Sequence, residues 1–191
     1  MEESSSGCIE TTPQQLVSKA LELVPEGNAG IAYTYNEPLI GYEFVRDCAG
    51  LAAEKGLSNV VVSNGYINEN PLRQLLPLID AFNIDLKSFS PAFYKGIGGD
   101  LEVVKNSIRL AAEQSHVEVT TLIIAGENDS EEEMRRLSQW LASIDSSAPL
   151  HISRFFPAYK MSDRRATPAS TIRKLAEIAR ESLLYVYEGN L

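Results

Sequence analysis

Polar side chains follow the predicted strands of this chain one after another, and their types suit the binding of a small charged ligand. The carboxyl ends of parallel strands meet at one edge of a sheet or barrel, so groups placed there converge in space. Each group alone has an ordinary explanation as a turn, a helix cap or a solvated pair, but five successive strand ends together predict a ligand site. The side chains are Tyr35, Asn36 and Glu37, then Ser63 and Asn64, Asp85 and Lys87, Thr120, and finally Arg154.

Asp85 and Lys87 lie two positions apart at the end of a predicted strand. The two-residue period of a strand puts both side chains on the same face. A carboxylate there can accept hydrogen bonds from hydroxyl or ammonium groups, and the lysine can hold a carboxylate, so a small zwitterion that carries a sugar would suit the pair. A lysine in this position can also form a Schiff base, which is the basis of an alternative hypothesis, a lyase that uses Lys87.

The order of elements predicts an α/β protein with parallel strands. Strands are expected to begin near residues 30, 59, 82, 117, 149 and 184, with a helical pattern in each interval. Intervals of this length with one helix each are typical of parallel crossovers. Local signals at the helix ends support the assignment: Thr12 before Pro13, Gly56 after a helix end, a capping box of Ser130 with Glu133, and Thr167 before Pro168.

Composition indicates a single globular domain over residues 1–191 that begins with a polar tail at 1–10. Apolar residues make up 44% of the chain and charged residues 23%. No apolar run approaches the length of a membrane span, and no signal peptide is visible, so we expect a soluble, cytoplasmic protein without a membrane partner. With 26 acidic and 17 basic side chains the net charge is −9, which disfavours nucleic acid as a partner.

The cysteines and histidines do not form a metal-binding pattern. Cys8 and Cys48 are the two cysteines, and their separation fits no ligand spacing. Cys48 is expected to be a buried core thiol and Cys8 to be exposed. His116 and His151 are each isolated in the sequence, so no metal site is predicted. The stretch "GIGGD" at 96–100 does not follow a strand and is interpreted as a turn rather than a phosphate loop.

Five ordered motifs together resemble one enzyme family. They read "YTYNEP", "VVSNGYI", "NIDLKSF", "TTLIIAGENDSEEE" and "LHISRFFP". This set is similar to the radical S-adenosylmethionine superfamily, in particular to pyruvate formate-lyase-activating enzymes and to the radical proteins of AmmeMemoRadiSam systems. The resemblance covers residues 11–190, and the order of the motifs is more specific than any one of them.

The resemblance implies a partial parallel (βα)6 barrel of the TIM type. In the family, a Cys-x3-Cys-x2-Cys loop holds a [4Fe-4S] cluster, and S-adenosylmethionine bound to the cluster is cleaved to a 5'-deoxyadenosyl radical that abstracts hydrogen. It also implies roles for residues at the strand ends. Glu37, with Tyr35 and Asn36, stands where relatives carry a Gly-Gly-Glu segment that receives the methionyl ammonium. Ser63 and Asn64 correspond to a Thr-Asn-Gly turn beside the ligand.

Asp85 and Lys87 match an Asp-x-Lys motif that contacts the ribose and carboxylate ends of S-adenosylmethionine. Thr120 and Arg154, which are expected at the next two strand ends, complete the predicted cofactor-binding residues. The catalytic residues and the substrate are not indicated, beyond a protein or small molecule at the open face of the barrel.

The triple-cysteine loop is absent from this chain. We therefore expect a barrel that lacks its first strand and cluster, with the [4Fe-4S] cluster present only in a longer parent protein and with no radical chemistry in this form. A cluster-free barrel that acts as a binding or interaction domain is the alternative, supported by the missing cysteines and by an aromatic and basic loop at residues 154–165. An unpaired sheet edge would favour self-association.

Overall fold

A computed structural model describes residues 9–191 as one six-stranded parallel sheet with the strand order β1-β2-β3-β4-β5-β6. The polar tail predicted at 1–10 therefore lies largely outside the described residues. All six strands occur where the sequence predicts them, and the α/β class with parallel strands is confirmed. The strands are β1 (Gly30–Tyr33), β2 (Ser58–Ser63), β3 (Ala81–Asp85), β4 (His116–Ile123), β5 (Leu150–Arg154) and β6 (Val186–Gly189).

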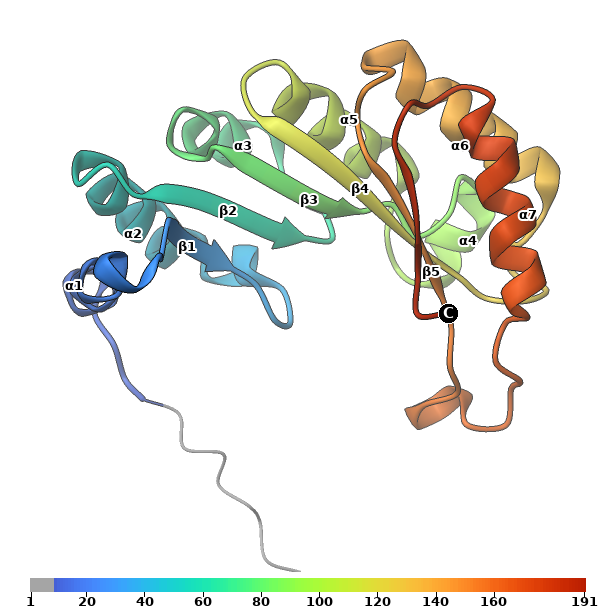
Figure 1. Ribbon diagram of the computed structural model, residues 1–191, viewed down its shortest axis with the longest axis horizontal. Coiled ribbons are helices and arrows are strands. Elements are labelled where there is room, and N and C mark those ends of the chain that lie inside the picture. Colours follow the sequence, from blue (N-terminus) through green and yellow to red (C-terminus); the bar gives the residue numbers. More distant parts are fainter. Residues whose placement is uncertain (1–8) are drawn as a thin grey trace, which may run out of the picture.

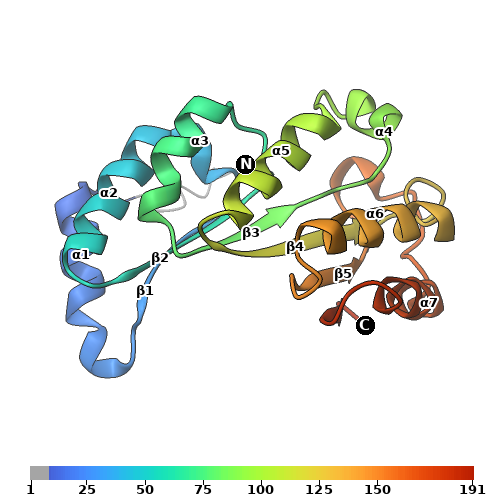
Figure 2. The same cartoon turned by 90° about the horizontal axis from the view of Figure 1, so that it is seen from above.

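The sheet curves into an arc with the helices along its outer side (Figure 1). Seen from above, α2, α3, α5 and α6 lie together on one side of the strands (Figure 2). β1 and β6 form the two ends of the arc and do not pair with each other in the part of the chain that is described. The α-helices are α1 (Pro13–Glu22), α2 (Tyr42–Glu54), α3 (Glu69–Leu75), α4 (Pro91–Gly96), α5 (Leu101–Ala112), α6 (Glu131–Ile144) and α7 (Ala169–Arg180). Short 3-10 helices are η1 (Val24–Glu26), η2 (Pro38–Gly41), η3 (Leu76–Leu78) and η4 (Tyr159–Met161). This architecture is a partial parallel barrel.

The strands alternate between a buried and a more accessible side chain. In β3, Phe82 and Ile84 are buried, whereas Asn83 and Asp85 are only half-buried. Parallel strands covered on both faces are apolar throughout, so the alternation shows that the helices cover the outer face only. The inner face of the arc is the accessible one, and it carries most of the polar strand residues.

A buried asparagine ties β1 and β2 to the outer helices. Asn59 is fully buried and accepts a hydrogen bond from the Tyr33 hydroxyl at 3.0 Å. Its amide nitrogen donates to the carbonyls of Ala49 and Leu78, both at 3.0 Å. Every polar group of the side chain is thus paired, which is the condition for a buried amide to be tolerated.

Two of the predicted helix caps differ in the structure. The Ser130 hydroxyl accepts from the Glu133 backbone N–H at 3.2 Å, but the Glu133 carboxylate accepts instead from the Phe89 backbone N–H at 2.7 Å, so the capping box is only half formed. Thr167 is not the cap of α7, because its hydroxyl donates to the Ile123 carbonyl at 2.6 Å and α7 begins after Pro168. In both cases a contact between elements replaces the local one. Gly56 has the expected left-handed φ of 73° after α2.

None of the helices in residues 9–191 combines the length and the apolar character that a membrane span requires.

Candidate functional site

Glu37 binds the end of β2 through its carboxylate. Its Oε1 accepts hydrogen bonds from the Ser63 hydroxyl at 2.8 Å and from the Leu39 backbone N–H at 3.1 Å. Its Oε2 accepts from the Asn64 backbone N–H at 2.7 Å. A carboxylate oxygen has two lone pairs, so Oε1 is saturated and Oε2 can accept one more donor. Glu37 is therefore first a link between two strand ends, with capacity left for one ligand hydrogen bond.

The two residues before Glu37 have the left-handed backbone that glycine favours. Tyr35 has a φ of 62° and Asn36 a φ of 52°, and both side chains are exposed. These are the positions where the resemblance expects glycines. The chain thus keeps the turn, although the left-handed conformation of Tyr35 costs about 1 kcal/mol or more in steric strain. Strained backbone of this kind is common at ligand sites.

Asp85 and Lys87 form an ion pair on the same side of the β3 end, as the strand period predicts. The Lys87 Nζ lies 2.8 Å from Asp85 Oδ2, and both side chains remain well exposed, at 44% and 39%. Ser63 pairs in register with Ile84. The next residues, Asn64 and Asp85, therefore lie side by side at the ends of neighbouring strands. The Glu37 link and the Asp85–Lys87 pair therefore lie on one rim.

The backbone of Lys87 is fixed from two sides. Its N–H donates to the Tyr94 hydroxyl at 3.1 Å, and its carbonyl accepts from the Asn128 side chain at 2.7 Å. Asn128 is 4% exposed and also bonds the Leu122 carbonyl and the Ile124 N–H, at 2.9 and 2.7 Å. Burial raises the pKa of Tyr94 to about 12, so its hydroxyl stays protonated. Neither residue was singled out from the sequence, although Asn128 lies in the strand-end loop "AGENDS".

Thr120 lies directly across from Asp85 in the sheet register, whereas Arg154 lies two strands away from Asp85, at the end of β5. Thr120 is inside β4 rather than at its end, and its hydroxyl donates to the Asn83 side chain at 2.8 Å. Arg154 ends β5 as predicted, but its Nε donates to the Thr167 carbonyl at 2.6 Å and its guanidinium lies over the Phe156 ring at 4.6 Å. Arg154 retains other N–H groups for a ligand.

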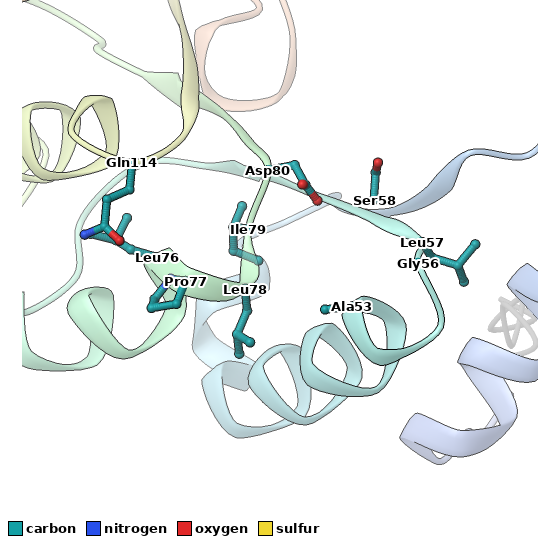
Figure 3. Close-up of a pocket in the computed structure, with 10 residues that line it drawn as sticks. All are labelled: Ala53, Gly56, Leu57, Ser58, Leu76, Pro77, Leu78, Ile79, Asp80 and Gln114. Carbon is teal, nitrogen blue, oxygen red and sulfur yellow. The ribbon is translucent and has the colours of Figure 1, made fainter.

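A cavity of about 470 Å³ opens beside the rim. Asn64 and Lys87 line it together with Tyr66, Tyr94 and the glycines after α4. Its volume is within the usual range for a small-molecule site. A larger cavity of about 630 Å³ lies at the opposite ends of the strands, beside Asp80 (Figure 3). The predicted residues are absent from its lining, so the smaller cavity is the relevant one.

Glu118 contacts both histidines through its carboxylate. The sequence did not predict this cluster. His151 Nε2 lies 2.7 Å from Glu118 Oε2, and His116 Nε2 lies 3.3 Å from Oε1. Burial acts to raise the pKa of Glu118, but the hydrogen bonds and charges of His151 and His116 outweigh it and the pKa is lowered. The histidines are therefore isolated only in the sequence. Within residues 9–191 no group of three metal-binding side chains is arranged to hold an ion.

Cys48 is completely buried on α2 and is a free thiol, as the sequence predicted. Burial raises its pKa to about 11. Cys8 lies outside the described residues.

A parallel partial barrel with polar groups at the carboxyl ends of its strands is the arrangement in which barrel folds place a ligand site at that rim. A family model for the radical SAM superfamily matches residues 3–141, and the chain belongs to that superfamily.

Relatives include activating enzymes and proteins without an assigned function. An uncharacterized protein of Methanocaldococcus jannaschii is 37% identical over 185 residues, which are 95% of this chain and 54% of that protein. The (2S)-3-sulfopropanediol dehydratase activating enzyme of Klebsiella oxytoca is 26% identical over 103 residues, which are 52% of this chain and 32% of that enzyme. The chain thus spans about half the length, or less, of these curated relatives.

Solved structures share the fold at low identity. A domain of the pyruvate-formate lyase-activating enzyme from Bacteroides vulgatus superposes with a TM-score of 0.72 at 18% identity, covering 85% of this chain and 99% of that one. Streptococcus suis SuiB, solved with S-adenosylmethionine bound, gives a TM-score of 0.77 at 10% identity, covering 98% of this chain and 45% of that one.

The residues present fit one of the two cofactors that this superfamily uses. For S-adenosylmethionine, the free acceptor position on Glu37, the exposed Asp85–Lys87 pair and the adjacent cavity offer partners for an ammonium, a ribose and a carboxylate. A cluster held by three thiolates does not fit, because the chain has two cysteines and Cys48 is buried. The cluster ligands are not supplied by these 191 residues.

Proposed function

We propose that this chain is the S-adenosylmethionine-binding core of a radical enzyme of the activating-enzyme type. Membership of the superfamily and the fold support the class. The observation that carries the proposal is the rim on which Glu37 links β1 to β2 beside the Asp85–Lys87 pair. The chemistry that S-adenosylmethionine brings to such enzymes is reductive cleavage, beside an iron–sulfur cluster, to a radical that abstracts hydrogen.

In this proposal the protein residues bind and orient. Glu37 accepts a hydrogen bond from the methionyl ammonium with Oε2, Asp85 accepts from the ribose, and Lys87 donates to the carboxylate. Tyr94 and Asn128 fix the Lys87 backbone by hydrogen bonds, so the Lys87 side chain extends from a rigid strand end. Tyr35, Asn36, Ser63, Thr120 and Arg154 remain proposed contacts on or near the same rim.

The test uses a longer version of the protein that carries a Cys-x3-Cys-x2-Cys loop before residue 1. It is reconstituted with iron and sulfide under anaerobic conditions and reduced in the presence of S-adenosylmethionine. We expect cluster absorbance in the visible range and formation of 5'-deoxyadenosine, and the absence of both would refute the proposal. The 191-residue chain, which lacks the thiolates, should give neither.

A cluster-free binding domain is the second candidate, and the cysteine content favours it. The sequence that precedes Met1 in the gene discriminates between the two, because a cluster loop there supports the enzyme and an upstream stop codon supports the binding domain. The lyase hypothesis is less consistent with the geometry, since the Lys87 ammonium group donates a hydrogen bond to Asp85 rather than offering a lone pair.

A further inference from the structure

The inner face of the sheet holds a polar cluster that the proposed cofactor rim does not use. Glu118 is its centre, with His151 from the neighbouring strand on one carboxylate oxygen and His116 on the other. The Asn83 side chain accepts from Thr120 at 2.8 Å and approaches Glu118 at 3.5 Å. The accessible face of a barrel is where a substrate can reach, so this cluster is a candidate for substrate chemistry.

The contact with Glu118 determines which nitrogen of the His151 ring carries the proton. An ionised carboxylate only accepts hydrogen bonds, and the lowered pKa of Glu118 keeps it ionised near neutral pH. Nε2, at 2.7 Å from Oε2, must therefore be protonated. In the neutral imidazole the lone pair is then on Nδ1. This is the arrangement in which a carboxylate orients a histidine to accept a proton at its other nitrogen.

Nδ1 of His151 is open to the inner face. No hydrogen bond to it is formed within residues 9–191, and it is not one of the buried polar atoms that lack a partner there. The side chain as a whole is 32% exposed. A ligand on the inner face can therefore reach the lone pair.

The ring is held in this orientation from two sides. Glu118 binds one edge, and Tyr187 from β6 stacks on the ring face with centroids 5.2 Å apart and planes inclined by 23°. His116 holds the second oxygen of Glu118 and limits rotation of the carboxylate. Of the titratable groups, Glu118 of β4 bonds the ring, Tyr187 of β6 stacks on it, and His116 of β4 is linked to it through Glu118. A ring fixed by neighbouring strands is suited to catalysis because its geometry does not have to be organised at each turnover.

The location of His151 places it across a short gap from the proposed cofactor rim. Asp85 pairs in register with Thr120, and Thr120 with His151, so the three residues form one row across β3, β4 and β5. Neighbouring strands lie about 4.8 Å apart, so two spacings separate Asp85 from His151 by roughly 10 Å. A substrate of a few heavy atoms bound over Thr120, the middle residue of this row, would span the distance between a cofactor on Asp85 and the ring of His151.

We propose that His151, positioned by Glu118, is the group that accepts a proton from an O–H or N–H of the substrate during the radical reaction. The proton passes from the substrate oxygen or nitrogen to Nδ1, the bonding electron pair stays on the substrate atom, and Glu118 stabilises the imidazolium. The substrate class is thus a small molecule or side chain with a hydroxyl or amino group next to the carbon that loses hydrogen. This inference rests on the proposed function.

The first test needs neither cluster nor substrate. Long-range ¹H–¹⁵N spectra of the 191-residue chain report the tautomer of His151, and diethyl pyrocarbonate followed by peptide mass spectrometry reports which histidine is acylated. We expect the Nε2–H tautomer and acylation of His151. In Glu118→Gln, whose amide can donate or accept, the two tautomers should become mixed, whereas His116→Gln should leave the tautomer unchanged. An Nδ1–H tautomer in the unaltered chain, or a His151 that resists acylation in the folded state, would overturn the proposal.

The second test separates His151 from the cofactor site. In the longer, reconstituted protein without substrate, Lys95→Met on α4 should form 5'-deoxyadenosine within about twofold of the unaltered protein, Lys87→Met should lose at least tenfold, and His151→Asn should lose much less than Lys87→Met. A loss in His151→Asn equal to that in Lys87→Met would assign His151 to cofactor binding and contradict the inference. If the unaltered protein forms no 5'-deoxyadenosine, the proposed function has failed, and the tautomer experiment still decides whether the pair is arranged to accept a proton.

Discussion

The Glu37 carboxylate accepts a hydrogen bond from the Ser63 hydroxyl at 2.8 Å, across 26 positions of sequence. This contact and the one to the Asn64 N–H make the turn after β1 and the end of β2 a single unit. The site is therefore organised before any ligand arrives, which lowers the conformational entropy lost on binding.

Replacing Glu37 with glutamine should destabilise the fold. An amide has one acceptor oxygen, so it cannot serve Leu39, Ser63 and Asn64 together, and at least one backbone N–H is left unpaired. We expect a loss of about 1–3 kcal/mol in the free energy of unfolding, measured by urea denaturation. Glu43→Gln, an exposed change on α2, is the matched control and should stay within about 0.5 kcal/mol. Equal effects of the two substitutions would contradict the role given to Glu37.

Tyr35→Gly should leave the protein as stable as before or more stable. The φ of 62° is strained for tyrosine and free for glycine, and at 88% exposure the ring contributes little packing. Relief of about 1 kcal/mol of backbone strain offsets the larger conformational entropy that glycine loses on folding. Ala32→Gly, at a regular strand position of β1, is the comparison and should lower the unfolding free energy. Similar losses in both variants would show that Tyr35 is not strained.

Acid should weaken the Glu118 cluster. Because the histidines hold the pKa of Glu118 below its ordinary 4.5 in the folded state, the stabilisation is complete above that value and is lost as the pH falls through the folded pKa. Glu118→Gln should therefore be less stable than the unaltered chain at about pH 6, and the difference should shrink towards about pH 3.5. Urea titrations at a series of pH values measure it, and a difference that does not change with pH would contradict the pairing.

Cys48 should resist thiol reagents in the folded protein. With its pKa raised to about 11 by burial, the thiolate fraction at about pH 8 is smaller than that of an ordinary cysteine by roughly 100-fold. Cys8→Ser leaves Cys48 as the one thiol, and its reaction with Ellman's reagent should be slow in buffer and fast in denaturant. Fast reaction under native conditions would show that α2 does not protect it.

The strands and the Asp85–Lys87 pair could be predicted because their signals are local. Apolar runs at regular intervals define the parallel strands, and the two-residue period of a strand places Asp85 and Lys87 on one side. The positive φ values of Tyr35 and Asn36 agree with the glycines expected there by resemblance, although nothing in the residues themselves demands that conformation.

What the sequence missed depends on contacts between distant segments. Glu118 and His151 meet only through the register of β4 with β5, which no spacing along the chain encodes. Thr167 and Glu133 carry good capping signals, but hydrogen bonds to Ile123 and Phe89, in distant segments of the chain, replace the local ones. Strand ends are also hard to place, which is why Thr120 proved to lie inside β4.

The binding of S-adenosylmethionine to the reconstituted longer protein tests the central claim most directly. Isothermal titration of the unaltered protein is compared with Lys87→Met and with Lys95→Met, an exposed lysine on α4 that serves as the matched control. A hydrogen bond between charged groups is worth about 1.5–3 kcal/mol, so Lys87→Met should weaken binding by roughly 10- to 100-fold while the control stays within about twofold. An affinity of Lys87→Met equal to that of the control would contradict the assignment of this rim to the cofactor.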